Sequence, residues 1–232
     1  MGTFYRVLAW AERHKQKLIV SAAVVAVAGV GVWYYVWKEA NAEATAGMEL
    51  SGLRPTPTAA GGLIPVPASA YLKVAEDYPK SSAAARALLL GAGALFTEGK
   101  YDEAKAHFDG LLRDYPSSPY RSEAMYGNAA CLEAQGKIAE ATAAFRNIVE
   151  RQPMAPVVQR AKLSLARLYQ TQSQVEQAYR LFEDVLRAEG MSFVGYQAEM
   201  GLEELKRSHP HLAAPPEAGL SFPVPTLGTN QP

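Results

Sequence analysis

A segment of 37 residues recurs three times along this chain of 232 residues. The copies YDEAKAHFDGLL, IAEATAAFRNIV and VEQAYRLFEDVL begin at Tyr101, Ile138 and Val175. Each has an alanine at its fourth position, a phenylalanine four residues later and an aliphatic pair after that. The same offset aligns alanines in the segments that precede the copies. Because three copies in one register seldom arise by chance, the chain is predicted to fold as a repeat array.

Each copy is predicted to form two helices. In the first copy, apolar residues recur at helical spacing over residues 88–95 and again over residues 104–111, and Gly99-Lys100 separates the two runs. One helical hairpin cannot bury both apolar faces alone, so the copies must stack. The predicted fold is an all-α solenoid of helical hairpins. It has about three full repeats, a partial first repeat and a final capping helix.

The residues of the first copy resemble those of the tetratricopeptide repeat. Gly99, Tyr101, Ala104, Phe108 and Pro116 occupy the characteristic positions of that family, although the spacing of 37 residues exceeds the usual 34. The resemblance implies a repeat domain over residues 69–207. It also implies a groove, lined by the first helix of each pair, that binds peptides.

By that resemblance, the groove residues lie on the first helix of each copy. They are Arg86, Leu89 and Phe96 in the first copy, Glu123, Tyr126 and Glu133 in the second, and Arg160, Leu163, Arg167 and Gln170 in the third. Repeats that clamp the carboxylate of chaperone tails use lysine and asparagine where this chain has Leu89, Tyr126 and Leu163, which disfavours a cytosolic chaperone adaptor. An alternative interpretation is that Leu89 and Leu163 only complete the packing between repeats.

An uncharged segment precedes the repeats. Leu18–Trp37 contains no charge and no proline, and its 20 residues would extend about 30 Å as a helix, the thickness of a hydrocarbon core. Aromatic residues gather at its end, as they do at membrane interfaces. The segment is therefore predicted to be a transmembrane helix. The alternative is a cleaved signal peptide with a cleavage site at Ala26-Val-Ala28, but the apolar sequence continues for nine residues beyond Ala28.

The charges that flank this segment predict its orientation. Basic residues dominate the residues before it, whereas acidic residues dominate those after it, so the N-terminus is expected in the cytoplasm and the repeats in the periplasm or another extracytoplasmic space. The expected location is the inner membrane, with a single pass. The predicted divisions are a cytoplasmic basic segment (1–17), a transmembrane helix (18–37), a juxtamembrane helix and Pro/Gly linker (38–68), the repeat domain (69–207) and a disordered Pro-rich tail (208–232). Within the linker region, Lys38–Leu50 is a candidate for the missing first helix of the partial repeat.

The candidates for chemistry are weak. Glu103, His107 and Asp109 lie close together along one predicted helix, as a metal or acid/base site would require. The 37-residue offset places Ala144 and Leu181 at the position of His107, so the framework recurs while the candidate ligands do not. We expect these side chains to face solvent. No motif for catalysis, a metal, a nucleotide or another cofactor is recognised, and the chain is predicted not to be an enzyme.

Composition excludes further classes of function. Lys plus Arg and Asp plus Glu number 23 each, so the overall charge gives no sign of nucleic acid binding, and no small-molecule substrate is indicated. Cys131 is the only cysteine, which excludes an intramolecular disulfide, and no cysteine near the start could accept a lipid. Cys131 is expected to be a small buried group.

The layout of a basic start, one span and an exported repeat domain resembles the ancillary Sec-translocon subunit family. That resemblance implies a non-enzymatic scaffold near the translocon, which binds exported or unfolded proteins or the periplasmic chaperones that receive them. The alternative is an envelope assembly or cell-division coordinating protein, similar to the β-barrel assembly lipoprotein or to the Tol-Pal-associated coordinator. Each hypothesis has proteins or peptides as partners.

Overall fold

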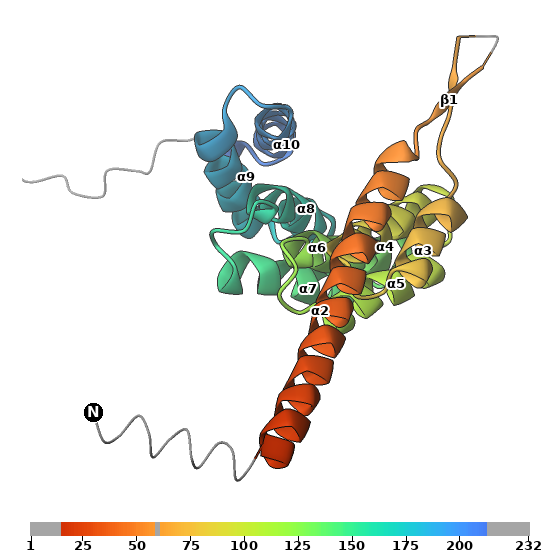
Figure 1. Ribbon diagram of the computed structural model, residues 1–232. Coiled ribbons are helices and arrows are strands. Elements are labelled where there is room, and N and C mark those ends of the chain that lie inside the picture. The colour runs from red at the N-terminus through yellow and green to blue at the C-terminus, as the bar shows by residue number, and fades with distance from the viewer. Residues whose placement is uncertain (1–14, 59–60, 213–232) are drawn as a thin grey trace, which may run out of the picture. The chain divides into compact units, whose positions relative to one another are not determined.

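The computed structural model describes residues 15–58 and 61–212, apart from the side chains of residues 18, 19, 21 and 22. The chain divides into two compact units, residues 1–127 and residues 128–232. The elements are α2 (Lys15–Gly52), β1 (Thr56–Pro57), β2 (Leu63–Ile64), α3 (Ala68–Asp77), α4 (Ser82–Thr97), α5 (Tyr101–Asp114), α6 (Arg121–Ala134), α7 (Ile138–Arg151), α8 (Val158–Thr171), α9 (Val175–Glu189), α10 (Phe193–Ser208) and the short 3-10 helix η1 (Pro210–Leu212) (Figure 1). The predicted all-α helical-hairpin array is confirmed.

One residue with a left-handed backbone ends the first helix of each full repeat. These residues are Gly99, Gly136 and Ser173, with φ angles of 77°, 73° and 58°. The residue after each of them donates its N–H to a carbonyl five residues earlier, which satisfies a carbonyl left free at the helix end. These bonds are Lys100 to Leu95 (2.9 Å), Lys137 to Leu132 (2.9 Å) and Gln174 to Tyr169 (2.8 Å). Glycine adopts this conformation without strain, whereas Ser173 does not.

The recurring phenylalanines pack against small residues on the helix that follows. A Cβ placed on Gly127 would lie 2.4 Å from the ring of Phe108, and one placed on Gly201 would lie 2.6 Å from the ring of Phe182. Both rings are buried. The 37-residue offset places Ser164 at the same position in the intervening repeat, where it is also buried. A small residue at this position therefore lets each helix approach the aromatic ring of the preceding one.

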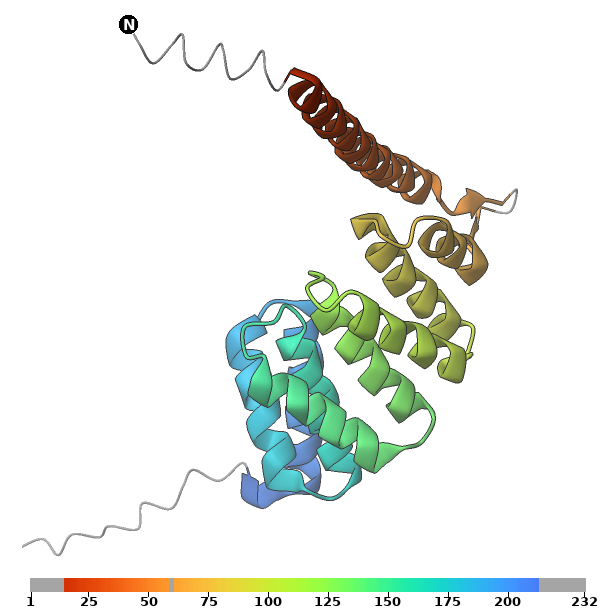
Figure 2. The same ribbon diagram turned by 60° about the horizontal axis from the view of Figure 1, so that its bottom comes forward.

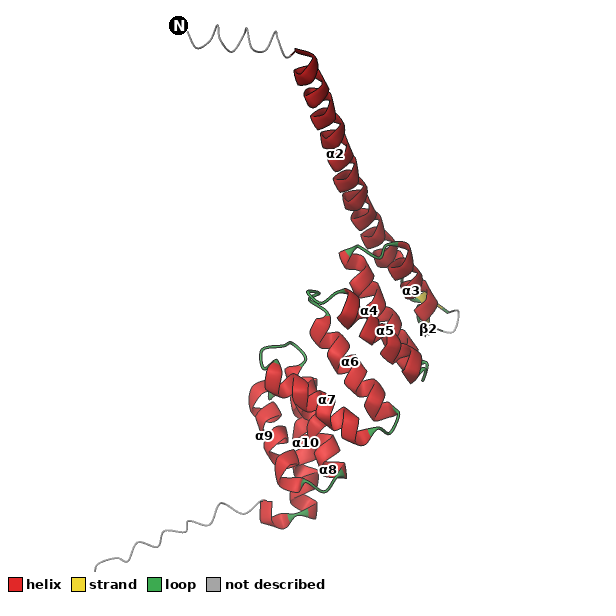
Figure 3. Ribbon diagram, turned by 90° about the horizontal axis from the view of Figure 1, so that it is seen from below, coloured by secondary structure: helices red, strands yellow, loops and turns green. Residues whose placement is uncertain are grey.

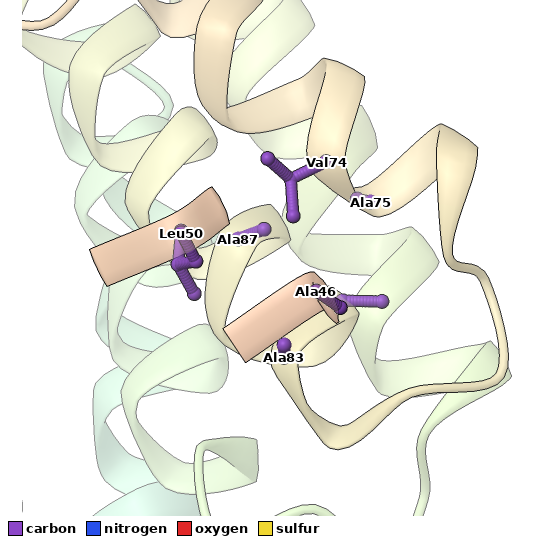
Figure 4. Close-up of a cluster of buried hydrophobic side chains, with 7 residues drawn as sticks. Ala46, Leu50, Val74, Ala75, Ala83 and Ala87 are labelled. Atoms are coloured by element: carbon purple, nitrogen blue, oxygen red, sulfur yellow. The ribbon is translucent and has the colours of Figure 1, made fainter. Parts of the chain in front are cut away.

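The helix missing from the partial first repeat is supplied by the end of α2. Ala46 and Leu50 of α2 are buried against Val74 and Ala75 of α3 and the alanines of α4 (Figure 4). Figure 3 shows that the beginning of α2 extends beyond α3 and α4, while its end lies beside them. Because α2 is a single helix of 38 residues, the apolar segment and the first helix of the repeats are continuous.

Two hydrogen-bonded contacts fasten this end of α2. Glu43 accepts hydrogen bonds from the backbone N–H of Ser82 (2.8 Å) and from its hydroxyl, at the start of α4. Glu49 accepts a hydrogen bond from the Tyr78 hydroxyl (2.9 Å), and this bond is the main reason that the pKa of Tyr78 is raised. A carboxylate is well placed at Ser82, because the N-terminus of a helix carries free N–H groups and partial positive charge.

The proline and glycine segment lies inside the first hairpin. It connects α2 to α3 and contains the antiparallel pair of β1 and β2, which extends away from the helices of its unit (Figure 1, Figure 2). The sequence had suggested that Lys38–Leu50, before this linker, is the missing first helix of the partial repeat. The packing of Ala46 and Leu50 against α3 and α4 confirms that interpretation.

Among the helices of the described residues, none combines the length and the apolar composition needed to cross a bilayer. Four side chains of the predicted span, at residues 18, 19, 21 and 22, lie outside the described part. So do residues 1–14 of the predicted cytoplasmic segment and residues 213–232 of the predicted tail.

Candidate functional site

The predicted groove residues of the first unit lie on α4 and α6. Arg86 is exposed, and Leu89, Glu123 and Tyr126 are partly exposed. Phe96 is also partly exposed, at the end of α4. Its ring centre lies 5.2 Å from that of Tyr101, the first residue of α5, with an angle of 59° between the rings. Phe96 therefore helps to close the hairpin of α4 and α5 in addition to presenting part of its ring to solvent.

In the second unit, the predicted residues separate into buried and exposed groups. Leu163 is only 4% exposed, so its side chain belongs to the core between helices. Arg160 and Arg167 are exposed, and Gln170 and Glu133 are partly exposed. The surface that a ligand could contact is consequently more polar than the sequence pattern suggested.

A cleft of about 490 Å³ lies where α8 and α10 meet. Its lining comprises Arg167, Gln170, Phe182, Gln197, Met200, Gly201, Glu203, Glu204 and Arg207. Two of these residues, Arg167 and Gln170, were predicted from the sequence. The others were not, since α10 had been interpreted as a capping helix.

The same offset shows why α10 contributes. Counting 37 residues from the groove positions of α8 identifies the equivalent positions of α10. Arg160, Leu163, Arg167 and Gln170 correspond to Gln197, Met200, Glu204 and Arg207, all of which line the cleft. Helix α10 therefore has the register of the first helix of a fourth repeat. Extending the offset once more would have found these residues.

The cleft combines an apolar base with a charged rim. Phe182 is 1% exposed and lies beneath Gly201, whereas Met200 is 57% exposed and available to a ligand. Arg167 and Arg207 supply positive charge at the rim, and Glu203 forms an ion pair with Lys206 at 3.2 Å. Such a surface can hold an apolar side chain while charged groups contact a peptide backbone or its polar side chains.

Glu133 lies on α6 and interacts with the charge of Arg167. Partial burial raises the pKa of the Glu133 carboxyl, and the positive charge of Arg167 opposes that rise. A carboxylate in such surroundings is stabilised when a cation approaches it. Glu133 could therefore contribute to binding a basic residue of a ligand.

The residues considered for chemistry do not assemble a reactive site. Asp109 forms an ion pair with Lys105 at 2.8 Å, Glu103 is exposed and His107 is partly buried. Cys131 is fully buried. Across residues 15–58 and 61–212, no group of three or more His, Cys, Asp or Glu residues is arranged to hold a metal ion.

Paired helices with left-handed turns, stacked through an aromatic ring on a small residue, define a helical-repeat protein of the kind that binds other proteins. Two family models described as Tetratricopeptide repeat match residues 95–163 and residues 68–119. Residues 68–163 are thus similar to tetratricopeptide repeats, and such repeats are generally non-enzymatic scaffolds for protein–protein interaction. Among curated proteins, no relative matches the chain at significant similarity.

Two solved structures of one repeat protein show the same fold at low identity. One is a crystal structure of nearly identical TPR-like repeats from a Podosopora anserina putative kinesin light chain, with 18% identity and a TM-score of 0.50, covering 62% of this chain and 78% of that one. A point variant of those repeats has 17% identity, a TM-score of 0.50 and coverages of 62% and 77%. The Sgt2 TPR domain from Aspergillus fumigatus has 20% identity and a TM-score of 0.44, with coverages of 61% and 91%.

Proposed function

We propose that this protein is a membrane-anchored scaffold that binds exported or unfolded polypeptides, or the chaperones that receive them, near a protein translocon. The observation that carries the binding part of this proposal is the cleft between α8 and α10. Groove positions of two successive repeats line it together, and its most exposed apolar side chain is that of Met200.

The composition of the cleft suits a peptide of variable sequence. Methionine is flexible and polarisable, so Met200 can adapt to apolar side chains of different shapes. The arginines at the rim can donate hydrogen bonds to backbone carbonyls or to carboxylates. Few of these contacts require one particular residue in the ligand. That combination fits a scaffold that encounters many unfolded clients.

The anchoring part of the proposal is supported by the uncharged sequence Leu18–Trp37. In the described part of this segment, the large apolar side chains from Val20 to Trp37 are 50–73% exposed. Apolar side chains on all sides of a helix are stabilised by an apolar environment. The flanking charges favour an inner-membrane protein whose repeats lie outside the cytoplasm.

A binding titration tests the proposal. The full chain is placed in lipid nanodiscs and titrated against a fluorescently labelled, permanently unfolded polypeptide. The double variant Met200→Glu with Arg167→Glu should bind at least about tenfold more weakly, since it introduces two negative charges into the cleft. The matched control is Met154→Glu, because Met154 is 94% exposed and does not line the cleft. Equal affinity of the double variant and the control would refute the cleft as the binding site.

A further inference from the structure

A second cleft, of about 300 Å³, lies in the first unit where α2 meets the loop between α3 and α4. Five residues of α2 line it, namely Tyr35, Lys38, Glu39, Ala42 and Glu43, and they share one face of the helix. The opposite wall consists of Asp77 to Ser81. This cleft is independent of the groove positions of the repeats.

Two of the carboxylates that line this cleft already have partners. Glu43 accepts hydrogen bonds from Ser82, and Asp77 forms an ion pair with Lys73 at 2.5 Å. Within the described part of the chain, neither Lys38 nor Lys80 has a carboxylate partner. The ammonium group of Lys80 instead lies 5.9 Å from the centre of the Tyr35 ring. Two positive charges in the cleft are thus available to an anion.

The cleft lies where the uncharged segment Leu18–Trp37 ends and charged residues begin. Tyr35 is within the last turn of Leu18–Trp37, and Lys38 is the first charged residue after it. The rings of Trp33 and Trp37, on the same turns of α2, stack on each other with centres 6.4 Å apart. Aromatic residues of this kind favour the level of lipid headgroups, and lysines near a helix end extend toward it.

We propose that this cleft binds the headgroup of a membrane phospholipid, whose phosphodiester lies between Lys38 and Lys80. This inference rests on the proposed anchoring of α2. Glu39 would accept a hydrogen bond from the ammonium or hydroxyl donors of the headgroup. The cleft also contains Glu43 and Asp77, whose negative charges repel a doubly charged anion more strongly than the single charge of a phosphodiester.

Binding at this position would hold the repeats at the bilayer surface. Glu43 and Glu49 fasten α2 to the start of α4 and to the end of α3, and Ala46 and Leu50 pack against both helices. Lys80 belongs to the loop between α3 and α4, whereas Lys38 belongs to α2. One phosphate between the two lysines would therefore join the membrane, the anchoring helix and the repeats.

Native mass spectrometry of the full chain tests this inference. The protein is released from detergent after incubation with phosphatidylethanolamine, with phosphatidylglycerol, or with a glycosyl diacylglycerol that lacks phosphate. We expect the two phospholipids to remain bound and the glycolipid to be lost. Lys38→Ala and Lys80→Ala should each lower phospholipid retention about fivefold, from the usual contribution of a lysine near a phospholipid surface.

The matched control is the double variant Lys100→Ala with Lys105→Ala, which removes two lysines of the same unit that do not line the cleft. Its phospholipid retention should equal that of the unaltered chain. If the double variant Lys38→Ala with Lys80→Ala retains as much phospholipid as the unaltered chain, the inference is wrong. Retention of the glycolipid by the unaltered chain would overturn it as well. Displacement of the lipid by inorganic phosphate would assign the site to free phosphate instead.

Extraction of membranes at alkaline pH separates this inference from the anchoring proposal. If the unaltered chain leaves the membrane, the anchoring proposal fails. If it stays in the membrane and the lysine variants retain phospholipid normally, only the headgroup site fails.

Discussion

The contact between Phe182 and Gly201 leads to a quantitative prediction about how the repeats stack. A Cβ on Gly201 would lie 2.6, 2.8 and 2.9 Å from three atoms of the Phe182 ring, well inside normal van der Waals contact. Phe182 is 1% exposed, so the ring has little space into which to move. Gly201→Ala should therefore introduce a steric cost of about 1–3 kcal/mol.

The higher helix propensity of alanine offsets about 1 kcal/mol of that cost, so the net loss of stability should be about 1 kcal/mol. In a Phe182→Leu background the ring is absent. There, Gly201→Ala should stabilise the protein by up to about 1 kcal/mol, because only the propensity gain remains. The sign of the substitution should thus reverse between the two backgrounds.

Urea denaturation of the full chain in detergent micelles, followed by circular dichroism at helical wavelengths, measures the free energy of unfolding of all four proteins in this double-mutant cycle. Gly93→Ala is the matched control, since Gly93 lies within α4 and a Cβ there would meet nothing within 4 Å. It should stabilise the protein by about 1 kcal/mol. If Gly201→Ala stabilises both backgrounds equally, Phe182 does not pack on Gly201 and the stacking account is wrong.

Three further predictions follow from single residues. Ser173→Gly should raise the free energy of unfolding by about 1 kcal/mol, because glycine adopts the left-handed φ of 58° without strain. Gly136→Ser should lower it by a similar amount. Unchanged urea midpoints would contradict the assigned turns. Burial raises the pKa of Glu133, so its charged form destabilises the fold increasingly as the pH rises above the ordinary pKa of 4.5. Glu133→Gln should therefore stabilise the protein at pH 7.5 but not at pH 4. Equal shifts of the melting temperature at the two pH values would refute this. Leu50→Ala should lower the local free energy of unfolding by about 2–5 kcal/mol and speed hydrogen exchange in α3 and α4. Met48 is exposed, so Met48→Ala should leave exchange unchanged. Similar exchange in the two variants would exclude α2 from the first hairpin.

The repeat architecture was predictable because its causes are local. A fixed offset carries the apolar stripes, the turn residues and the phenylalanines through all three copies. Even the serine at the third turn falls at the position where the other copies have glycine. Sequence periodicity therefore determined the hairpins and the positions of the groove residues on their first helices.

The role of α10 was harder to predict because charged residues occupy the positions through which the first helix of a repeat faces its second helix. The positions that face a second helix in the other repeats are occupied in α10 by Glu199, Glu203 and Lys206. These charges fit a helix whose outer face meets solvent, which is why it resembled a simple cap. Its groove positions, including Met200, nevertheless follow the repeat.

The arrangement at the start of the repeats depends on contacts between distant segments. The bonds from Ser82 to Glu43 and from Tyr78 to Glu49 join residues that lie 39 and 29 positions apart. The proline and glycine segment separates α2 from α3 along the chain. The continuity of α2 and the cleft beside Lys80 were for that reason not apparent from the sequence.

Site-specific photocrosslinking in native membranes tests the central claim most directly. A photoreactive amino acid is placed at Met200, in the cleft, or at Met154, which is also exposed but lies outside it. The account predicts that position 200 crosslinks to exported polypeptides or their chaperones and that position 154 does not. Equal crosslinking at both positions, or adducts at position 200 with only barrel-assembly or cell-division proteins, would contradict it.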